Sequence, residues 1–189
     1  MASIAPAATR FTSEEYFALI DQGTLRSDDR VELLEGVIVA MAPENPRHAV
    51  ATEKTAEALR GAVGGRAAIR VQHALHLGAH SVPEPDVAIV PGKHDDYVRA
   101  HPRTALLVVE VADTSLIQDR LSKAAIYAAA GVPEYWIINL RDDRLEIFRA
   151  PDRGAARYAE KRLLARGERV ELAQLPGATI AVDALLPGG

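Results

Sequence analysis

The sequence predicts a mixed α/β fold, in which a mixed β-sheet is flanked by α-helices. Three segments carry helix caps or helically spaced apolar residues, and short strand-like runs separate them. Of the 189 residues, 48% are hydrophobic and 25% are charged, which is the composition of a folded domain. A chain of this length suits one domain, so we expect residues 1–189 to form a single domain with a core at about residues 11–175.

The three expected helices have recognisable ends. Thr12 and Glu15 form a capping-box pattern, and the helix that follows is expected to stop at Gly23. A longer helix is expected from Pro46 to about Val63, because glycines follow it. The third is expected over 117–130, where one narrow apolar face suits packing on a sheet. That face consists of Ile117, Leu121, Ala124, Ala125 and Ala128.

The expected strands differ in how deeply they are buried. Residues 31–34 and 37–41 flank Glu35-Gly36 as a hairpin, and residues 67–77 alternate as in a half-exposed strand. Residues 87–90 and 105–109 are almost continuously apolar, which indicates central strands. Further strands are expected at 135–140, 145–148, 158–164 and 169–172.

Composition and charge exclude several classes of function. The chain has no cysteine, which excludes disulfides, thiolate zinc sites, iron–sulfur clusters and a cysteine nucleophile, and which suits a reducing cytoplasm. There are 22 Lys and Arg against 26 Asp and Glu, so the surface as a whole is not a nonspecific polyanion binder. The N-terminus lacks an export signal and no apolar run is long enough for a membrane span. We therefore expect a cytoplasmic protein without membrane contact.

Two carboxylates stand out because they fall on the two central strands. Glu110 follows the apolar run 105–109, and Asp86 directly precedes the run 87–90. An unpaired buried charge costs several kcal/mol, so Glu110 needs a cation, a proton or a metal ion. If the two strands are neighbours, their carboxylates meet, and hard oxygen ligands without cysteine favour Mg²⁺ or Mn²⁺ over zinc.

These residues resemble the signature of the PD-(D/E)XK nuclease superfamily. Pro85-Asp86 matches its first half and Glu110-Val111 begins its second, although Ala112 occupies the lysine position. The surrounding sequence is more specific: over about residues 11–148 it resembles the Uma-type restriction endonuclease family. The matching segments are VELLEG, PEPDVAIV, LLVVEVADTSL, Asp119, Lys123 and YAAAGVPEYWIINL. The resemblance implies a restriction-endonuclease-like fold.

The resemblance also implies a set of site residues. Its catalytic residues are Asp86, Glu110, Lys123 and Glu32. In that family the lysine lies on the helix after the second strand, so Lys123 takes over from the missing strand lysine. Glu110 and Ala112 point to the same face of a strand, which leaves room for Lys123 beside the carboxylate. Supporting contacts are expected from Gln72, His48 and Tyr127.

The implied activity is metal-dependent hydrolysis of phosphodiester bonds by an endonuclease that acts on DNA. Asp86, Glu110 and the Val111 carbonyl would hold Mg²⁺, with Mn²⁺ as a substitute. Cutting both strands requires two active sites, so a homodimer is expected. Nucleic acid is the expected partner.

Two other functions remain open from the sequence. One is a catalytically inactive nucleic-acid-binding or assembly module of the same fold, against which the retention of the four polar positions argues. The other is a zinc hydrolase that uses His73, His76 and His80. On a strand, His73 and His76 face opposite sides, which argues against shared coordination.

Overall fold

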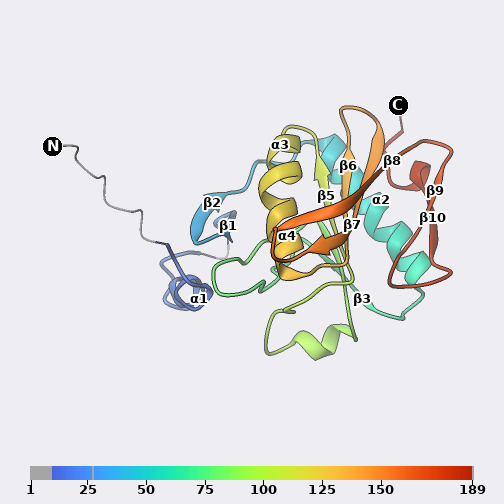
Figure 1. The fold of residues 1–189 in the computed structure, drawn as a ribbon. Helices are drawn as coiled ribbons and strands as arrows, with labels where there is room; N and C mark the ends of the chain where they lie inside the picture. Colours follow the sequence, from blue (N-terminus) through green and yellow to red (C-terminus); the bar gives the residue numbers. More distant parts are fainter. Residues whose placement is uncertain (1–9, 27, 189) are drawn as a thin grey trace.

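The computed structural model describes residues 10–26 and 28–188, which are arranged around a six-stranded sheet (Figure 1). The order across the sheet is β3-β4-β5-β6-β7-β8. Only β5 and β6 are parallel, and the other neighbours in this sheet are antiparallel. The strands are β3 (Ala68–Val71), β4 (Val87–Val90), β5 (Leu107–Ala112), β6 (Glu134–Asn139), β7 (Arg144–Asp152) and β8 (Arg157–Ala165). The predicted mixed α/β class is confirmed.

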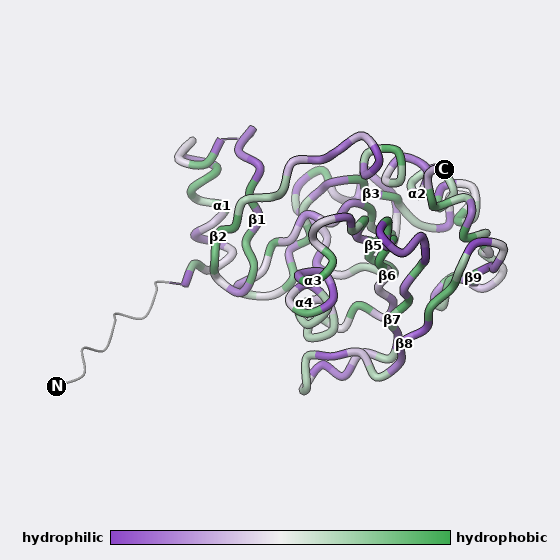
Figure 2. Tube along the Cα trace, turned by 90° about the horizontal axis from the view of Figure 1, so that it is seen from above, coloured by the Kyte–Doolittle hydropathy of each residue, from purple (hydrophilic) through white to green (hydrophobic). Residues whose placement is uncertain are grey.

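Helices cover both faces of this sheet, as Figure 2 shows for α2 and α4. Alternate residues of β5 explain the two layers: Val109 and Val111 join the core under α2, while Val108 and Ala112 join the core under α4. The helical elements are α1 (Ser13–Asp21), α2 (Pro46–Val63), η1 (His94–Tyr97), α3 (Leu116–Gln118), the π-helical turn η2 (Asp119–Lys123), α4 (Ala124–Ala130) and η3 (Val182–Ala184). No helix of the described residues has the length and apolar character that crossing a membrane requires.

Two small sheets flank the central one on opposite sides (Figure 1). The hairpin of β1 (Val31–Leu34) and β2 (Val37–Ala40) is tied to the segment before β4 by an antiparallel bridge between Leu33 and Val82. Together with Tyr16 of α1, these two residues form a separate small core. On the other side, β9 (Arg169–Glu171) pairs with β10 (Thr179–Ala181), and this pair packs into the main core.

Most predicted elements are confirmed with their ends close to the expected residues. The capping box forms, because the Thr12 hydroxyl accepts from the Glu15 N–H at 3.1 Å and the Glu15 carboxylate accepts from the Thr12 N–H at 2.8 Å. Gly64 ends α2 in the left-handed conformation, at a φ of 58°. The two runs expected to be central contribute to β4 and β5, and both strands are buried at every residue.

The single long strand expected over 67–77 is wrong. β3 ends at Val71, because Gln72 has a φ of 51°, which no extended strand tolerates. The chain then continues as a loop in which Ala74, Leu75 and Leu77 are buried rather than alternately exposed. His73 and His76 therefore lie in this loop, and the alternation of side chains along a strand does not apply to them.

The apolar face expected for the third helix is confirmed at Ala124 and Ala128, which are buried, but it is wrong in the first half of the helix. Ile117 and Leu121 are 74% and 67% exposed, whereas Asp119 and Lys123 are buried. The reason is the π-helical turn between α3 and α4, whose wider turn rotates the chain relative to an ideal helix. The structure thus buries two charged side chains on the face that the sequence pattern assigned to leucine and isoleucine.

Glu146 of β7 supports a prediction about stability and pH. Its fully buried carboxylate accepts hydrogen bonds from Arg120, from Lys161 Nζ at 2.8 Å and from Asn139 Nδ2 at 2.9 Å. Burial alone raises the pKa, but these three donors prevail and lower the pKa of Glu146 to about 2. This carboxylate therefore stabilises the fold fully above its ordinary pKa, and the contribution is lost as the pH falls towards 2.

We expect urea unfolding between pH 6 and pH 3 to show a steeper loss of stability in the wild type than in Glu146→Gln. The difference should be on the order of 2 kcal/mol, because Arg120 and Lys161 are partly exposed and solvent screens them. Parallel pH profiles of the two proteins would show that Glu146 is not stabilised in this way.

Candidate active site

The two strand carboxylates predicted from the sequence lie side by side. In the antiparallel register of β4 and β5, Val87 is opposite Val109, so the next pair along the strands is Asp86 and Glu110. Asp86 is 8% exposed and Glu110 is 3% exposed. The Val111 N–H donates to Asp86 Oδ2 at 2.7 Å, which fixes the Asp86 carboxylate against β5.

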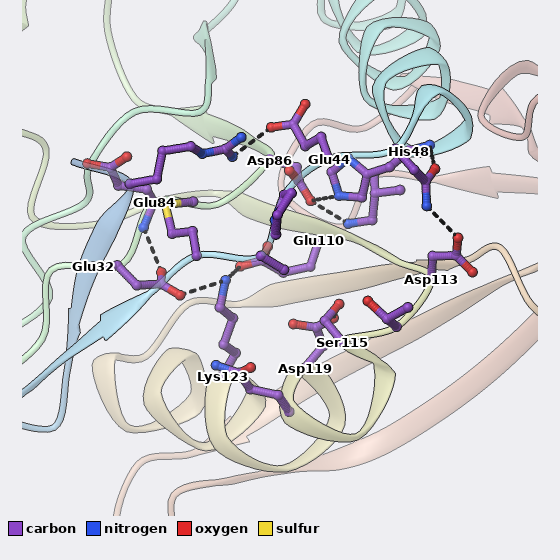
Figure 3. A pocket seen from close by; sticks show the side chains of 18 of the residues that line it. Glu32, Glu44, His48, Glu84, Asp86, Glu110, Asp113, Ser115, Asp119 and Lys123 are labelled. Carbon is purple, nitrogen blue, oxygen red and sulfur yellow. Dashed lines mark hydrogen bonds and ion pairs between the residues drawn. The ribbon is translucent and has the colours of Figure 1, made fainter. Parts of the chain in front are cut away.

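Lys123 reaches this pair from η2, as Figure 3 shows. Its Nζ lies 3.0 Å from Glu110 Oε1 and 3.3 Å from Glu32 Oε1, and the residue is 7% exposed. One ammonium group therefore bridges two buried carboxylates. The wide turn of η2 contributes to this position, because it points Lys123 towards the sheet.

Glu32 enters the site from the β1–β2 hairpin. It is 2% exposed, and its Oε2 accepts a hydrogen bond from the Glu84 N–H at 3.1 Å. With the bridge between Leu33 and Val82, this bond fixes the hairpin against the segment that leads into β4. The early acidic position of the sequence is thus brought to the two strand carboxylates.

Tyr127 lies on the inner side of Glu110. Its hydroxyl donates to Glu110 Oε1 at 2.6 Å, and both side chains are buried in the layer between β5 and α4. Tyr127 does not line the cavity described below, so it contacts Glu110 from the protein interior. This arrangement suits a residue that orients the carboxylate.

His48 approaches Asp86 from the start of α2. Asn45 caps this helix by accepting from the His48 N–H at 2.9 Å, and its Nδ2 donates to Asp113 Oδ2 at 2.7 Å. His48 Nε2 then lies 3.3 Å from Asp86 Oδ2. Burial lowers the pKa of His48, but Asp86, Glu44 and the Val111 backbone together outweigh burial and raise it overall.

One cavity of about 90 Å³, in which carboxylates outnumber cationic groups, is lined by Glu32, His48, Asp86, Glu110 and Lys123 among others. The basic side chains that line the cavity are Lys123, Arg30 and the imidazole of His48. Its seven carboxylates belong to Glu32, Glu44, Glu84, Asp86, Glu110, Asp113 and Asp119. The surplus of negative charge in a confined space favours the binding of a cation.

The pKa values of two acids show the effect of this crowding. Burial holds the pKa of Glu110 well above its usual value, and Asp86, Asp119 and Glu32 add to the shift while Lys123 opposes it. Burial also raises the pKa of Asp119 to about 6, against the opposing effects of Lys123 and of the Ser115 hydroxyl. Both shifts show that the cavity disfavours the charged forms of these acids.

The donor set fits a hard divalent cation. The Asp86 and Glu110 carboxylates and the Val111 carbonyl are oxygen ligands of the kind that Mg²⁺ and Mn²⁺ prefer. Across residues 10–26 and 28–188, no three His, Cys, Asp or Glu side chains gather into a metal-ligand cluster. Within these residues, His73, His76 and His80 therefore form no such cluster. His80 Nδ1 lies 3.0 Å from the Phe11 carbonyl oxygen.

Gln72 lies beside the cavity rather than in it. Its backbone N–H donates to the Asp86 carbonyl at 3.1 Å, and its side-chain amide donates to Glu44. It lines a second, adjoining cavity. The sequence-predicted supporting residues thus reach the site from three directions: His48 from α2, Tyr127 from α4 and Gln72 from the end of β3.

Several lining residues were not predicted from the sequence as parts of the site. Asp119 is 2% exposed and accepts from the Ser115 hydroxyl at 2.6 Å. Glu84 and Asp113 adjoin the strand carboxylates in the sequence. Glu84 precedes β4 and Asp113 follows β5, and these ends of two antiparallel neighbours lie together. This proximity was the sequence signal that could have identified both residues.

The sequence matches a known protein family over most of its length. The model of the Uma2 family, described as "Putative restriction endonuclease", matches residues 13–183. The chain belongs to the Uma2 family. A search of curated proteins found no match.

A solved structure supports the same fold. It is described as "a putative nuclease belonging to DUF820" from Anabaena variabilis, and it matches with a TM-score of 0.72 and 12% sequence identity. The match covers 93% of this chain and 97% of the other. In this Uma2 protein the resemblance to restriction endonucleases is therefore confirmed at the level of family and fold.

Proposed function

We propose that this Uma2 protein is a metal-dependent endonuclease that hydrolyses phosphodiester bonds in DNA. The observation that carries the proposal is the placement of Asp86, Glu110 and Lys123 around one acidic cavity, at the start of β4 and the end of β5. Two adjacent carboxylates and a buried ammonium group form the minimal set for metal-assisted attack of water on a phosphate. Family membership supports the same reaction class.

Each residue has a role in this proposal. Asp86, Glu110 and the Val111 carbonyl would hold Mg²⁺, or Mn²⁺ in its place, which supplies a bound water of lowered pKa and neutralises charge on the phosphate. Lys123 donates from Nζ to the water or to a phosphate oxygen. Glu32 holds Lys123 from the side opposite Glu110, and Tyr127 keeps the Glu110 carboxylate oriented.

A second candidate function has an observation of its own. Glu110 Oε1 accepts from both Lys123 and Tyr127, and Asp86 Oδ2 accepts from Val111 and faces His48. Carboxylates that already have protein partners suit a catalytically inactive nucleic-acid-binding or assembly module. The surplus of seven carboxylates over Lys123 and Arg30 in the cavity favours the endonuclease, because it leaves negative charge for a bound cation to neutralise.

The two functions are separated by their action on closed circular DNA. We expect the wild type to convert supercoiled plasmid into nicked and linear forms in Mg²⁺ or Mn²⁺, because an endonuclease needs no free end. Single-stranded DNA and RNA of matched length test the preference for DNA. Retarded migration of intact plasmid, without nicking in either ion, would support the inactive module instead.

A thermal prediction concerns the metal site. If Mg²⁺ or Mn²⁺ binds between Asp86 and Glu110, it relieves their mutual repulsion and stabilises the folded state selectively. At an ion concentration about 100-fold above Kd, the gain is roughly 2.7 kcal/mol, which raises the Tm by several degrees. Asp86→Asn should lose this increase. An unchanged Tm at millimolar ion, with no heat of binding by calorimetry, would contradict the shared site.

A homodimer is proposed for cleavage of both strands, since a two-fold axis places two active sites on antiparallel strands. Light scattering should give about twice the chain mass of 20.3 kDa. A monomer mass at assay concentration, with DNA present, would contradict this arrangement.

A further inference from the structure

A second cavity, of about 520 Å³, adjoins the candidate active site. It lies between α1, the β1–β2 hairpin and the end of β3, and we call it the side cavity. Arg30, Met41, Glu44 and Glu84 line both cavities, so a ligand in the side cavity is next to the proposed reaction centre. Its volume is in the range of sites that hold small organic molecules.

The lining of the side cavity combines apolar surface with hydrogen-bonding groups. Tyr16, Leu25 and Val31 belong to, or pack against, the small core under α1, and they provide the apolar surface. Gln72 and Glu44 provide hydrogen-bonding groups at the border with the active site, and the remaining polar lining consists of the charged side chains of Arg26, Asp29, Arg30 and Glu84. A flat ring with polar edges matches this combination of apolar surface and hydrogen-bonding groups.

Gln72 is fixed in an unusual conformation at this border. Its φ of 51° lies in the left-handed region that glutamine rarely adopts. Its backbone N–H is bound by the Asp86 carbonyl, and its side chain is held by Glu44, which also accepts from Arg30 at 2.8 Å. Strained residues that their surroundings hold in place occur preferentially at functional sites. The position of the Gln72 amide is thus coupled to that of Asp86.

Two arginines line the same cavity and are exposed to solvent. The side chains of Arg26 and Arg30 are 71% and 47% exposed, and both are available to phosphate groups through exchange of their surface ion pairs. A nucleic-acid strand whose phosphates contact them would run along the border of the two cavities, because Arg30 lines both, and could place a neighbouring phosphate at Asp86 and Glu110. An adjacent base then has the side cavity within reach.

We propose that the side cavity holds one nucleobase turned out of its stack, next to the bond that is cleaved, and that the Gln72 amide binds the edge of this base. The inference rests on the proposed nuclease function and names its substrate class: nucleic acid in which a base leaves the stack at low cost. Single strands and mismatched duplexes meet this requirement, because extrusion of a paired base costs more.

The test compares binding to two DNA duplexes that differ by one mismatch, measured by fluorescence anisotropy of an end label in a chelator, so that nothing is cleaved. We expect the wild type to bind the mismatched duplex about tenfold more tightly, which is a typical effect of a modest difference in unpairing cost. Leu25→Trp fills the cavity and Gln72→Gly removes the amide while suiting the positive φ, so both should lose this ratio. Val98→Trp, at a residue 80% exposed and outside the cavity, should keep it.

Equal affinity of the wild type for both duplexes would overturn the inference, as would a preference that survives in folded Leu25→Trp and Gln72→Gly. Cleavage is scored separately in Mg²⁺. Mismatch preference without any cleavage supports the side cavity and rejects the nuclease, whereas cleavage of both duplexes without preference in binding supports the nuclease and rejects the side cavity.

Discussion

Replacing Glu110 with glutamine is expected to lower the rate of DNA cleavage at least about a thousandfold. Glutamine has the same size and keeps an oxygen for the Tyr127 hydroxyl, but it removes the negative charge that the proposed metal site needs. A thousandfold loss corresponds to about 4 kcal/mol of transition-state stabilisation, which is within the range of single groups that act on developing charge. Single-turnover cleavage rates in Mg²⁺ measure the effect.

A matched control variant distinguishes the loss of a site residue from the general effect of removing a buried negative charge. Glu134 is 1% exposed and accepts from Arg149 at 2.9 Å and from the Trp136 indole at 2.9 Å, but it does not line the cavity. Glu134→Gln should reduce stability and leave the cleavage rate of the folded protein within a few-fold of the wild type. Equal losses of activity in both variants would mean that Glu110 acts only through the fold.

The second large effect is expected for Lys123→Met, which should slow cleavage about a hundredfold or more. The variant should also be less stable at neutral pH, because it leaves Glu110 and Glu32 buried without their shared cation. Protonation relieves this repulsion, so the stability lost should be partly regained as the pH falls. Cleavage rates and urea unfolding at two pH values measure both effects.

Ala112→Lys in the Lys123→Met background tests whether the two positions share one space. Ala112 lies on the same face of β5 as Glu110 and packs against the α4 layer. A lysine there reaches the vacated volume, and partial recovery of the rate is expected, since about 1 Å of misplacement costs on the order of a hundredfold. Full activity of Lys123→Met would remove the role of Lys123. A folded double variant with no recovery would refute the shared space.

The sequence predicted the fold well where local rules act alone. The capping box at Thr12, the hairpin at Glu35-Gly36 and the apolar runs of β4 and β5 depend on neighbouring residues, and they are found as expected. The errors arise where tertiary contacts override the local pattern. Gln72 leaves the strand because the Asp86 carbonyl and Glu44 hold it in a left-handed turn.

The same distinction applies to the candidate site. Asp86 and Glu110 were identifiable because a carboxylate on an apolar strand requires compensation. The position of Lys123 beside Glu110 was expected only through the family resemblance. The inward direction of Asp119 was not predicted, because ideal helical spacing assigned the buried face to Ile117 and Leu121. The π-helical turn changes which side chains face the sheet, and the helical spacing of apolar residues does not predict such a turn.

The most direct test of the central claim is the single-turnover cleavage of DNA by the wild type with and without free divalent ion. We predict phosphodiester cleavage in Mg²⁺ or Mn²⁺, none in a chelator, and none above background in Glu110→Gln in either condition. The absence of cleavage by folded wild type in both ions, or cleavage by Glu110→Gln at the wild-type rate, would contradict a metal-dependent centre at Asp86, Glu110 and Lys123.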